Sequence, residues 1–289
     1  MIQLGIIGHP LGHTLSPVMH KAALDHLDIE GDYIALDTPP EDLVTRIKYL
    51  KVQGFKGFNV TIPLKVWITP LLNEVDEYAN LAGAVNTVII SENKSLYGCN
   101  TDIDGFISSI PENVRASLKS KNAAVFGVGG AARAVAIGLA MIGVKEITFY
   151  ARNPQKAVKI KNIIFSSFPE IKVNIQEFNE FANLGYASIV INTTPLGLQG
   201  VNEDISPLNK KAVGGLVENT IVYDLIYKPR ETRLITYAKS RGLYTIDGLE
   251  MLVLQGAKAF SLWMDKEAPV DIMREAVLKS LKSEGNNIT

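Results

Sequence analysis

The chain has 289 residues, a length that favours two domains on a prior of about 150 residues each. Its 29 basic and 30 acidic side chains give a formal net charge of −1, so no footprint for nucleic acid or anionic lipid is present and we expect small-molecule ligands. The single cysteine, Cys99, excludes an internal disulfide, and no Cys/His spacing fits a zinc site. The sequence shows neither a secretory leader nor an apolar run of about 18 residues, and we therefore expect a cytoplasmic protein without a membrane span.

In the first part of the chain, short apolar runs alternate with stretches of helical period, the pattern of an α/β protein with mainly parallel sheets. The predicted strands are 2–8, 32–36, 57–60, 85–90 and 95–99, of which the last two form a hairpin. The predicted helices are 18–27, 41–51 and one that opens at Asn100-Thr101-Asp102. Ser16 and Pro17 are predicted as N-cap and first residue of the first helix, and residues 61–65 are predicted to turn from a strand into a further helix.

A polar stretch, 111–122, precedes a second βαβ alternation, and we place a domain boundary there. The predicted strands that follow are 123–126, 147–150, 173–175, 188–192, 221–225 and 244–246, which have doubly wound spacing. Helical patterns then cover 249–263 and 270–281. The predicted organisation is a first α/β domain over 1–110, a dinucleotide-binding Rossmann domain over 111–247, and C-terminal helices over 248–289 that return to the first domain.

A glycine-rich turn lies between an apolar strand and an apolar helix and fits the pattern G-x-G-x-x-A. Gly127 permits the tight turn, Gly129 lets the backbone approach a diphosphate, and Ala132 allows the helix to pack closely on the strand. Free N–H groups at the helix start, around Gly130 and Ala131, then face the phosphates. The alternative is a tight connection without a ligand, which the flanking strand and helix disfavour.

The segment after the second strand of this domain indicates NADP as the cofactor. An acid at this place would bond the ribose 2′-hydroxyl of NAD, and the chain instead has Arg152, Asn153 and Lys156. Two cations and no acid favour a 2′-phosphate. The alternative is that Arg152 and Lys156 form a solvated helix start.

Several ordered segments recur in one known family. They are Thr14-Leu15-Ser16-Pro17, Asn59 to Lys65, Gly83 to Thr87, Asn100 to Asp102, the glycine turn, Asp224 to Pro229, and Asp247 to Gln255. Over nearly its whole length the chain resembles the shikimate dehydrogenases, which reduce 3-dehydroshikimate with NADPH. The resemblance implies reversible formation of shikimate, a step of the chorismate pathway of aromatic amino acid biosynthesis.

Lys65 and Asp102 are the predicted catalytic pair. Hydride reduction of a ketone leaves an alkoxide that must take a proton, and an ammonium group supplies both charge stabilisation and the proton. A neighbouring carboxylate would hold the ammonium and bond a substrate hydroxyl. The resemblance implies the same pair. From spacing alone, a snorkelling Lys65 and an N-capping Asp102 are the alternatives.

A small carboxylate with several hydroxyls needs short polar donors and acceptors. The predicted substrate-binding residues are Asn59, Thr61, Asn86, Thr101 and Gln255. The resemblance adds Tyr227 and assigns Thr14 and Ser16 to the carboxylate. For Asn59 and Asn86 the alternative is turn chemistry at strand ends. Thr14 stands where the family usually has Ser, so discrimination between shikimate and the bulkier quinate stays open.

Further cofactor contacts are predicted at the carboxyl edge of the second sheet. Thr193 and Thr194 follow strand 188–192 and should border the ribose and nicotinamide. The resemblance adds Leu225, Gly248 and Met251, although helical methionines are usually core residues.

Four histidines, at positions 9, 13, 20 and 26, lie near the N-terminus. They have no metal-ligand spacing, and a lysine is already assigned to proton transfer, so we expect loop or surface positions for them and no metal.

Two alternatives to a shikimate-specific enzyme remain at this point. One is a quinate/shikimate dehydrogenase with relaxed use of NAD and NADP. The other is a protein that binds shikimate and NADPH without catalysis, which an intact Lys65 and Asp102 disfavour. A homodimer is the assembly considered, although the sequence does not indicate an oligomeric state.

Overall fold

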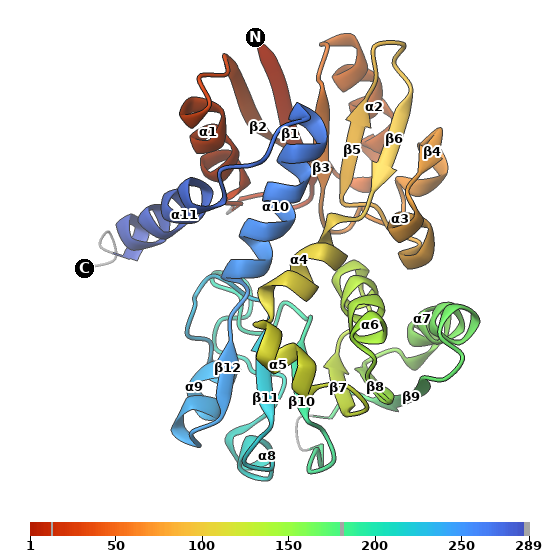
Figure 1. Cartoon of the computed structure of the whole chain (residues 1–289), viewed down its shortest axis with the longest axis vertical. Coiled ribbons are helices and arrows are strands. Elements are labelled where there is room, and N and C mark those ends of the chain that lie inside the picture. The colour runs from red at the N-terminus through yellow and green to blue at the C-terminus, as the bar shows by residue number, and fades with distance from the viewer. Residues whose placement is uncertain (13, 180–181, 286–289) are drawn as a thin grey trace. The chain divides into compact units, whose positions relative to one another are not determined.

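The chain is described by a computed structural model over residues 1–12, 14–179 and 182–285 (Figure 1), so His13 lies outside the described residues. Two compact units are present: the first is Met1–Gly105 with the chain from Val253 onward, and the second is Phe106–Leu252. The chain passes between them inside two helices, α4 (Thr101–Ser109) and α10 (Leu249–Met264). Because both divisions fall inside helices, no loop residues in the sequence mark them. The boundaries predicted from sequence therefore lie outside these helices, after residues 110 and 247.

The first unit contains a six-stranded mixed sheet with the order β2-β1-β3-β5-β6-β4. Its strands are β1 (Ile2–Gly8), β2 (Gly31–Asp37), β3 (Gly57–Val60), β4 (Glu74–Val75), β5 (Thr87–Ile90) and β6 (Leu96–Cys99). β1, β2 and β3 are parallel, and β5 and β6 form the predicted hairpin, which is confirmed. β5 runs antiparallel to both of its neighbours, β3 and β6, whereas β6 and β4 run in the same direction as β3. Five of the six strands of this sheet are thus parallel, and the expectation of a mainly parallel sheet is confirmed.

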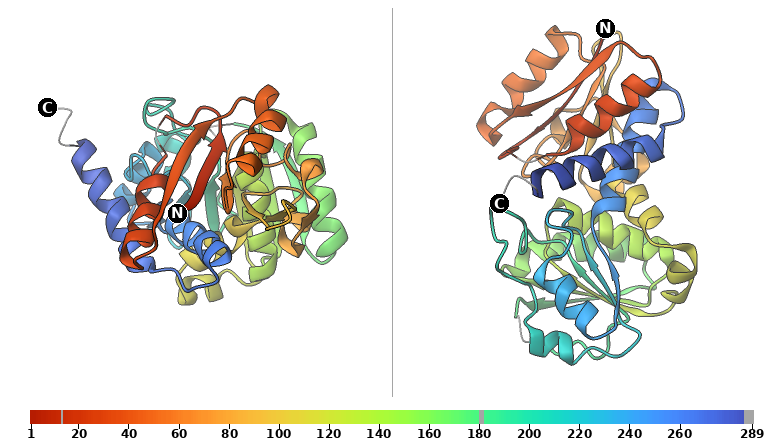
Figure 2. Two further views of the ribbon diagram at one scale, coloured as in Figure 1. Left: turned by 90° about the horizontal axis from the view of Figure 1, so that it is seen from above. Right: turned by 90° about the vertical axis from the view of Figure 1, so that its left-hand side faces the viewer.

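The helices of the first unit pack on this sheet and on one another. They are α1 (Ser16–His26), α2 (Leu43–Val52), α3 (Glu77–Ala82), α11 (Val270–Gly285) and the adjoining parts of α4 and α10. α11 packs against α1 (Figure 2). Trp263 of α10 donates from its indole Nε1 to the carbonyl oxygen of Val88 in β5 at 3.0 Å. A Cβ on Gly57 would lie 2.1 Å from this Nε1, so the indole occupies the space that glycine leaves on β3.

The predicted cap of the first helix is wrong. The N-cap of α1 is Leu15, and Ser16 is the first helical residue, with Pro17 next to it. The Ser16 hydroxyl makes no capping bond; it accepts a hydrogen bond from the Thr14 hydroxyl at 3.2 Å. Because Ser16 lies inside the helix and not at the N-cap position, its hydroxyl does not accept from the N–H groups of the first turn.

The predicted helix after strand β3 is also wrong. Residues 62–67 form turns that lead into a short 3-10 segment, Thr69–Leu71. Pro70 has no N–H for a helical bond to residue 66. The carbonyl oxygen of Lys65 accepts from the backbone N–H of Val85 at 2.8 Å, which ties this turn to the residues that precede β5.

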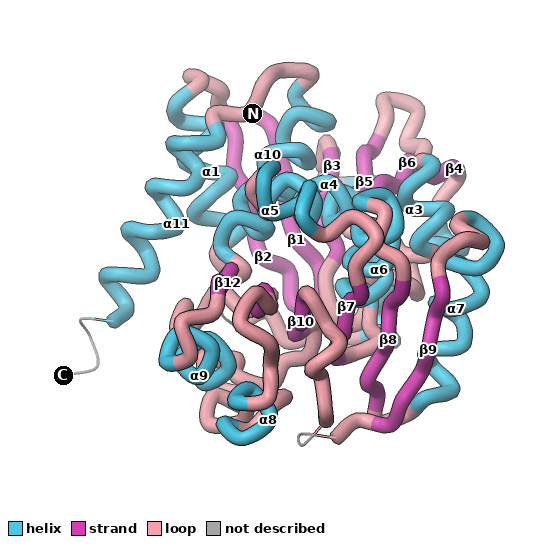
Figure 3. Tube along the Cα trace, turned by 60° about the horizontal axis from the view of Figure 1, so that its bottom comes forward, coloured by secondary structure: helices cyan, strands magenta, loops and turns pink. Residues whose placement is uncertain are grey.

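The second unit contains a six-stranded, wholly parallel sheet with the order β12-β11-β10-β7-β8-β9. The strands are β7 (Asn122–Phe126), β8 (Glu146–Ala151), β9 (Lys172–Glu177), β10 (Ile189–Asn192), β11 (Ile221–Asp224) and β12 (Tyr244–Ile246). The helices are α5 (Glu112–Ser117), α6 (Gly130–Ile142), α7 (Pro154–Ser167), α8 (Lys210–Gly214) and α9 (Arg233–Ser240). Figure 3 shows β7, β8 and β9 side by side, with α7 next to β9. The doubly wound prediction is confirmed.

His20 contradicts the expectation of a loop or surface histidine, because its side chain is fully buried. Its ring stacks on Tyr33 with centroids 4.3 Å apart and also packs against Phe260 and Trp263. Neither ring nitrogen has a hydrogen-bond partner among the described residues. Burial lowers the pKa of His20 from 6.5 to about 3. The ring is therefore neutral and acts as an aromatic core residue.

This burial predicts acid-sensitive stability. Above pH 6.5, His20 is neutral in both folded and unfolded chains; below it, only the unfolded chain takes up the proton. Two pH units below the unfolded pKa, the free energy of unfolding should therefore be lower by about 2–3 kcal/mol from this residue. Urea unfolding of the natural chain and His20→Phe at pH 7 and about pH 4.5 measures the effect. Equal losses of stability in both proteins would show that His20 does not contribute.

No helix in the described part of the chain combines the length and apolarity needed to cross a membrane.

Candidate active site

Lys65 and Asp102 form an ion pair in the first unit. Lys65 lies in the turn after β3, and Asp102 is the second residue of α4. Lys65 Nζ is 2.5 Å from Asp102 Oδ2, and the two side chains are 14% and 7% exposed. Asp102 Oδ1 accepts from the amide of Asn86 at 2.8 Å. Both carboxylate oxygens thus face side-chain donors, a geometry unlike that of a helix cap or of a lysine extended into solvent.

The Asn86 side chain makes hydrogen bonds to several polar residues around this pair. Its Nδ2 donates to Asp102 Oδ1, to Thr101 Oγ1 at 2.9 Å and to Gln255 Oε1 at 3.3 Å. Its Oδ1 accepts from the Thr101 backbone N–H at 2.7 Å and from Thr87 Oγ1 at 3.1 Å. An amide has two N–H groups and two lone pairs, so the capacity of Asn86 is used within the protein. Direct binding of a substrate hydroxyl would first have to replace one of these contacts, of which the one to Gln255 is the longest.

Asn59 closes the other side of this network. It lies on β3 and is 5% exposed. Its Nδ2 donates to the Asn86 carbonyl oxygen at 3.1 Å and to Thr87 Oγ1 at 3.0 Å, while its Oδ1 accepts from Tyr33 at 2.7 Å. These contacts use both N–H groups of Asn59 and one lone pair of Oδ1, so the second lone pair of Oδ1 can still accept a hydrogen bond. Thr61, two residues on, is half-buried, and its N–H bonds to the Ile7 carbonyl oxygen at 2.9 Å.

Thr14 and Ser16 bring two hydroxyls together at the N-terminus of α1. Thr14 Oγ1 donates to Ser16 Oγ at 3.2 Å and accepts from the Ser16 backbone N–H at 3.3 Å. The first turn of α1 has no acidic residue. Hydroxyl donors at the positive end of a helix suit a carboxylate. The predicted substrate residues of the first unit therefore belong to two groups, this hydroxyl pair and the network around Asn59, Asn86 and Gln255.

In the second unit the glycine turn has the geometry that a diphosphate requires. Gly127 has φ +105°, which favours glycine, and a Cβ there would lie 2.5 Å from Thr193 Oγ1. Gly129 is the N-cap of α6, and a Cβ on it would meet nothing within 4 Å. The first helical bond of α6 runs from Arg133 N–H to the Gly129 carbonyl oxygen, so the preceding N–H groups of the helix have no acceptor one turn back. Open space in front of such donors fits a dinucleotide phosphate.

Thr193 and Thr194 are held in the turn after β10. The hydroxyl of Thr193 donates to the Phe126 carbonyl oxygen at 2.6 Å, and that of Thr194 donates to Asn192 Oδ1 at 2.6 Å. These bonds set the shape of the loop next to the glycine turn.

Asp224, for which the sequence predicts no role, organises this edge of the sheet. The buried carboxylate accepts from Asn192 Nδ2 at 2.9 Å, from the Ile226 N–H at 3.2 Å and from Thr232 Oγ1 at 2.7 Å. Burial raises the pKa of Asp224 to about 7, and the three hydrogen bonds oppose that rise. Its position at the end of an apolar strand in the segment 224–229 is the signal that could have identified it.

The residues predicted to select NADP lie at the start of α7. Asn153 is the N-cap, and its Oδ1 accepts from the Gln155 N–H at 3.1 Å. Arg152 and Lys156 are exposed, and among the described residues neither side chain makes an ion pair. Two exposed cations beside a helix start fit an added phosphate.

The remaining predicted residues of the second unit are Tyr227, Leu225, Gly248 and Met251. Tyr227 is half-buried, and burial raises its pKa. Met251 is 7% exposed, which leaves little surface for a cofactor contact. Gly248 packs against the end of β11: its N–H bonds to the Ile226 carbonyl oxygen at 3.0 Å, and a Cβ would lie 2.0 Å from the Leu225 carbonyl oxygen. Their roles toward ligands stay predictions.

The packing of Gly248 gives a direct test. Gly248→Ala places a methyl group against backbone that cannot turn away, so the end of β11 has to move. We expect the free energy of unfolding to fall by about 1–3 kcal/mol, measured by urea unfolding. Gly214→Ala is the matched control, because a Cβ there meets nothing within 4 Å. Equal unfolding midpoints for the two variants would contradict this account.

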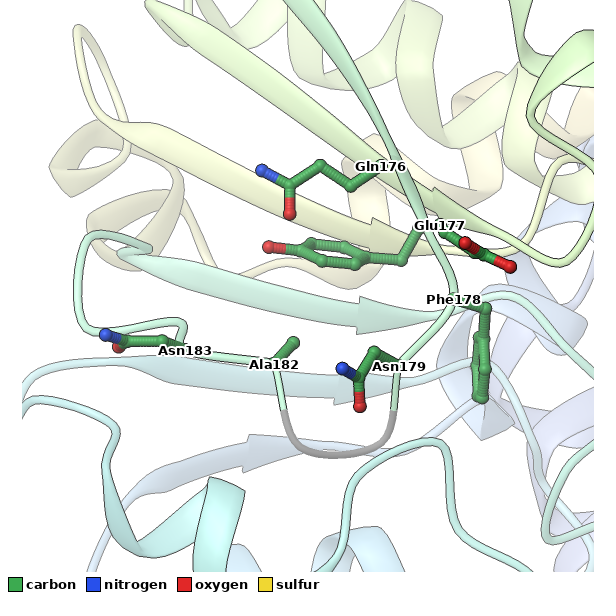
Figure 4. A pocket seen from close by; sticks show the side chains of 7 residues that line it. Gln176, Glu177, Phe178, Asn179, Ala182 and Asn183 are labelled. Carbon is green, nitrogen blue, oxygen red and sulfur yellow. The ribbon is translucent and has the colours of Figure 1, made fainter.

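The second unit also contains a cavity of about 480 Å³ (Figure 4). It is lined by Tyr150, Gln176, Glu177, Phe178, Asn179, Ala182 and Asn183. None of them is a predicted site residue. Within the described residues, no group of three or more His, Cys, Asp or Glu side chains could hold a metal ion.

Comparison with known proteins decides among the families that could use such a site. Residues 6–88 match the family profile of the shikimate dehydrogenase substrate binding domain, and residues 248–278 match that of the shikimate 5′-dehydrogenase C-terminal domain. A shikimate dehydrogenase (NADP(+)) from Synechocystis sp. is 42% identical over 282 residues, which cover 96% of each chain. The chain belongs to the shikimate dehydrogenase family.

Solved structures of shikimate dehydrogenases and their relatives share this fold. A shikimate 5-dehydrogenase from Thermus thermophilus, in complex with NADP(H) and shikimate, is 35% identical with a TM-score of 0.83, over 96% of this chain and 99% of that one. A quinate dehydrogenase from Corynebacterium glutamicum, in complex with NAD, is 31% identical with a TM-score of 0.87, over 96% and 99%. This fold thus occurs both in a shikimate dehydrogenase with bound NADP(H) and in a quinate dehydrogenase with bound NAD.

Proposed function

We propose that this chain catalyses the reversible, NADP-dependent reduction of 3-dehydroshikimate to shikimate. The observation that carries the proposal is the Lys65–Asp102 ion pair, 2.5 Å long and set in the Asn86 network, in a chain with 42% identity to an NADP(+) shikimate dehydrogenase. An ammonium held by a carboxylate is the group that a forming alkoxide requires.

In the direction of reduction, Lys65 donates a proton from Nζ to the carbonyl oxygen of the substrate as that oxygen becomes an alcohol. NADPH, when bound at the glycine turn, supplies the hydride. The Asp102 carboxylate holds the ammonium in place, stabilises its charge and has further lone pairs for a substrate hydroxyl. In the direction of oxidation, the neutral amine of Lys65 takes the proton back.

The other predicted residues bind the rest of the substrate. Thr14 and Ser16 receive the carboxylate at the start of α1, because both hydroxyls can turn their hydrogens toward an anion. Asn59, Thr61, Thr101, Gln255 and Tyr227 receive the ring hydroxyls and the edge of the ring. Arg152 and Lys156 bind the 2′-phosphate of NADP.

One alternative has a specific observation in its favour. Thr14 stands where the family usually has Ser, and a quinate dehydrogenase complexed with NAD matches the chain with a TM-score of 0.87. A quinate/shikimate dehydrogenase with relaxed cofactor use is therefore the second candidate.

A cytoplasmic location and a homodimer complete the proposal. Light scattering of the purified protein measures its mass directly, and a mass equal to one 31.6 kDa chain would remove the homodimer.

Two measurements on one sample test catalysis against mere binding. Calorimetry reports whether NADPH and shikimate bind, and the appearance of NADPH absorbance with shikimate and NADP⁺ reports hydride transfer. We expect both. Binding without any absorbance change would replace the proposed enzyme with a ligand-binding protein.

A further inference from the structure

We propose that Tyr33 is a positioning residue of the substrate site, which fixes the Asn59 amide so that this side chain can only accept a hydrogen bond from the substrate. The inference rests on the proposed function, because it concerns Asn59 as a substrate-binding residue. Tyr33 lies on β2, and from sequence alone an aromatic residue in a strand is expected only to pack in the core.

The ring of Tyr33 is buried and packs against the rings of His20 and Trp263. The residue is 2% exposed, and its ring stacks on His20 at 4.3 Å with an angle of 9° between the planes. Trp263 lies against it with centroids 6.3 Å apart, and Phe260 packs against the far side of the cluster through His20. The neutral His20 adds no charge to this layer. The phenol oxygen is therefore the one polar atom of Tyr33, and the packed rings fix where it points.

The phenol group donates to Asn59 Oδ1 at 2.7 Å. Burial raises the pKa of Tyr33 well above its usual range, so the hydroxyl keeps its hydrogen and remains a donor, although a hydrogen bond with Ser16 acts in the opposite direction. With Oδ1 turned toward Tyr33, the Asn59 Nδ2 group donates to the Asn86 carbonyl oxygen and to Thr87. Both N–H groups are used, and one lone pair of Oδ1 is left. A substrate group at this place has to be a donor, as a ring hydroxyl is.

Tyr33 also joins the two ends of the predicted substrate site. On one side, the hydroxyl of Ser16, which is paired with that of Thr14, acts on the phenol group to lower its pKa. On the other side, Asn59 leads through Thr87 and Asn86 to Asp102 and Lys65. A continuous chain of hydrogen bonds thus links the phenol group of Tyr33 to the ion pair. Removing the phenol oxygen would break this chain and leave the buried Asn59 Oδ1 without its donor, so that only the two Nδ2 bonds, to the Asn86 backbone carbonyl oxygen and to Thr87 Oγ1, would hold the amide.

Tyr33→Phe removes this one atom while keeping the ring. We expect the KM for shikimate to rise about tenfold, with kcat within about twofold of the natural enzyme and the KM for NADP⁺ unchanged. A role in stability alone would lower the Tm and leave the KM for shikimate where it was. An unchanged KM for shikimate overturns the proposal.

Tyr223→Phe is the matched control. Tyr223 is also fully buried, and its hydroxyl is 2.6 Å from Ser109 Oγ in the second unit. The control loses a comparable phenol hydrogen bond, so we expect a similar fall in Tm without a rise in the KM for shikimate. An equal rise in both variants would show that lost stability causes the effect.

A double-mutant cycle tests whether Tyr33 acts through Asn59. In the Asn59→Ala background, Tyr33→Phe should change the KM for shikimate by less than about twofold, because the amide that it positions is gone. If the KM of the double variant instead rises by the product of the two single increases, Tyr33 acts independently of Asn59. Turnover of shikimate by the natural enzyme tests the proposed function separately, and the ratio of variant to natural KM tests Tyr33.

Discussion

Replacing Lys65 with methionine should lower kcat for shikimate oxidation by at least about 100-fold, the usual contribution of a positioned acid or base. Methionine keeps the length of the side chain and removes the ammonium that lies 2.5 Å from Asp102. Steady-state kinetics with saturating NADP⁺ and shikimate measure the effect. A loss smaller than about tenfold would remove Lys65 from the proton transfer.

Two controls keep this result interpretable. Lys172→Met removes a lysine that pairs with Glu146 at 3.0 Å but is 67% exposed, and it should leave kcat unchanged. Thermal unfolding and NADP⁺ binding of Lys65→Met show whether the variant is folded, since Asp102 loses its cation in a site where it is 7% exposed. An inactive variant that still binds NADP⁺ and unfolds cooperatively supports the catalytic role.

Replacing both Arg152 and Lys156 with alanine should lower kcat/KM for NADP⁺ by about 100-fold or more, because each charged contact to a phosphate contributes about 1.5–3 kcal/mol. The value for NAD⁺ should stay within about threefold, since NAD⁺ has no 2′-phosphate for these side chains to bind. Specificity constants for both cofactors, at one ionic strength, measure the change.

Lys159→Ala with Lys161→Ala is the matched pair of substitutions. Both lysines are exposed on the same helix, α7, so this variant loses the same charge farther from the helix start. It should keep the preference for NADP⁺. If it loses as much as the Arg152 and Lys156 variant, general attraction of the anionic cofactor is the cause and no specific phosphate site exists at Arg152.

Strong local patterns made much of the fold predictable from sequence. The strands 57–60 and 244–246 have the predicted bounds, and the glycine turn lies between β7 and α6 as its spacing requires. The predictions that fail concern competition for hydrogen bonds. Ser16 does not cap α1 because it lies inside the helix and its hydroxyl is bonded to that of Thr14. The turn at Lys65 does not continue as a helix because its carbonyl oxygen is taken by Val85.

The composition of the candidate site was more predictable than its connections. Lys65 and Asp102 could be named from the chemistry and from motifs, and the structure places them in contact. Tyr33 and His20 could not, because an aromatic strand residue and a single histidine have no distinguishing spacing. Asn86 bonds to Gln255, 169 positions later in the chain, and sequence alone cannot show that its amide is saturated. Whether all donors and acceptors of a side chain are already bonded can be read only from the three-dimensional structure.

The central claim, that the chain oxidises shikimate with NADP⁺, is tested most directly by four specificity constants: shikimate and quinate, each with NADP⁺ and NAD⁺. We predict that shikimate with NADP⁺ has the highest kcat/KM, by at least about tenfold over the other three pairs. A highest value for quinate, or equal values for both cofactors, would contradict the claim.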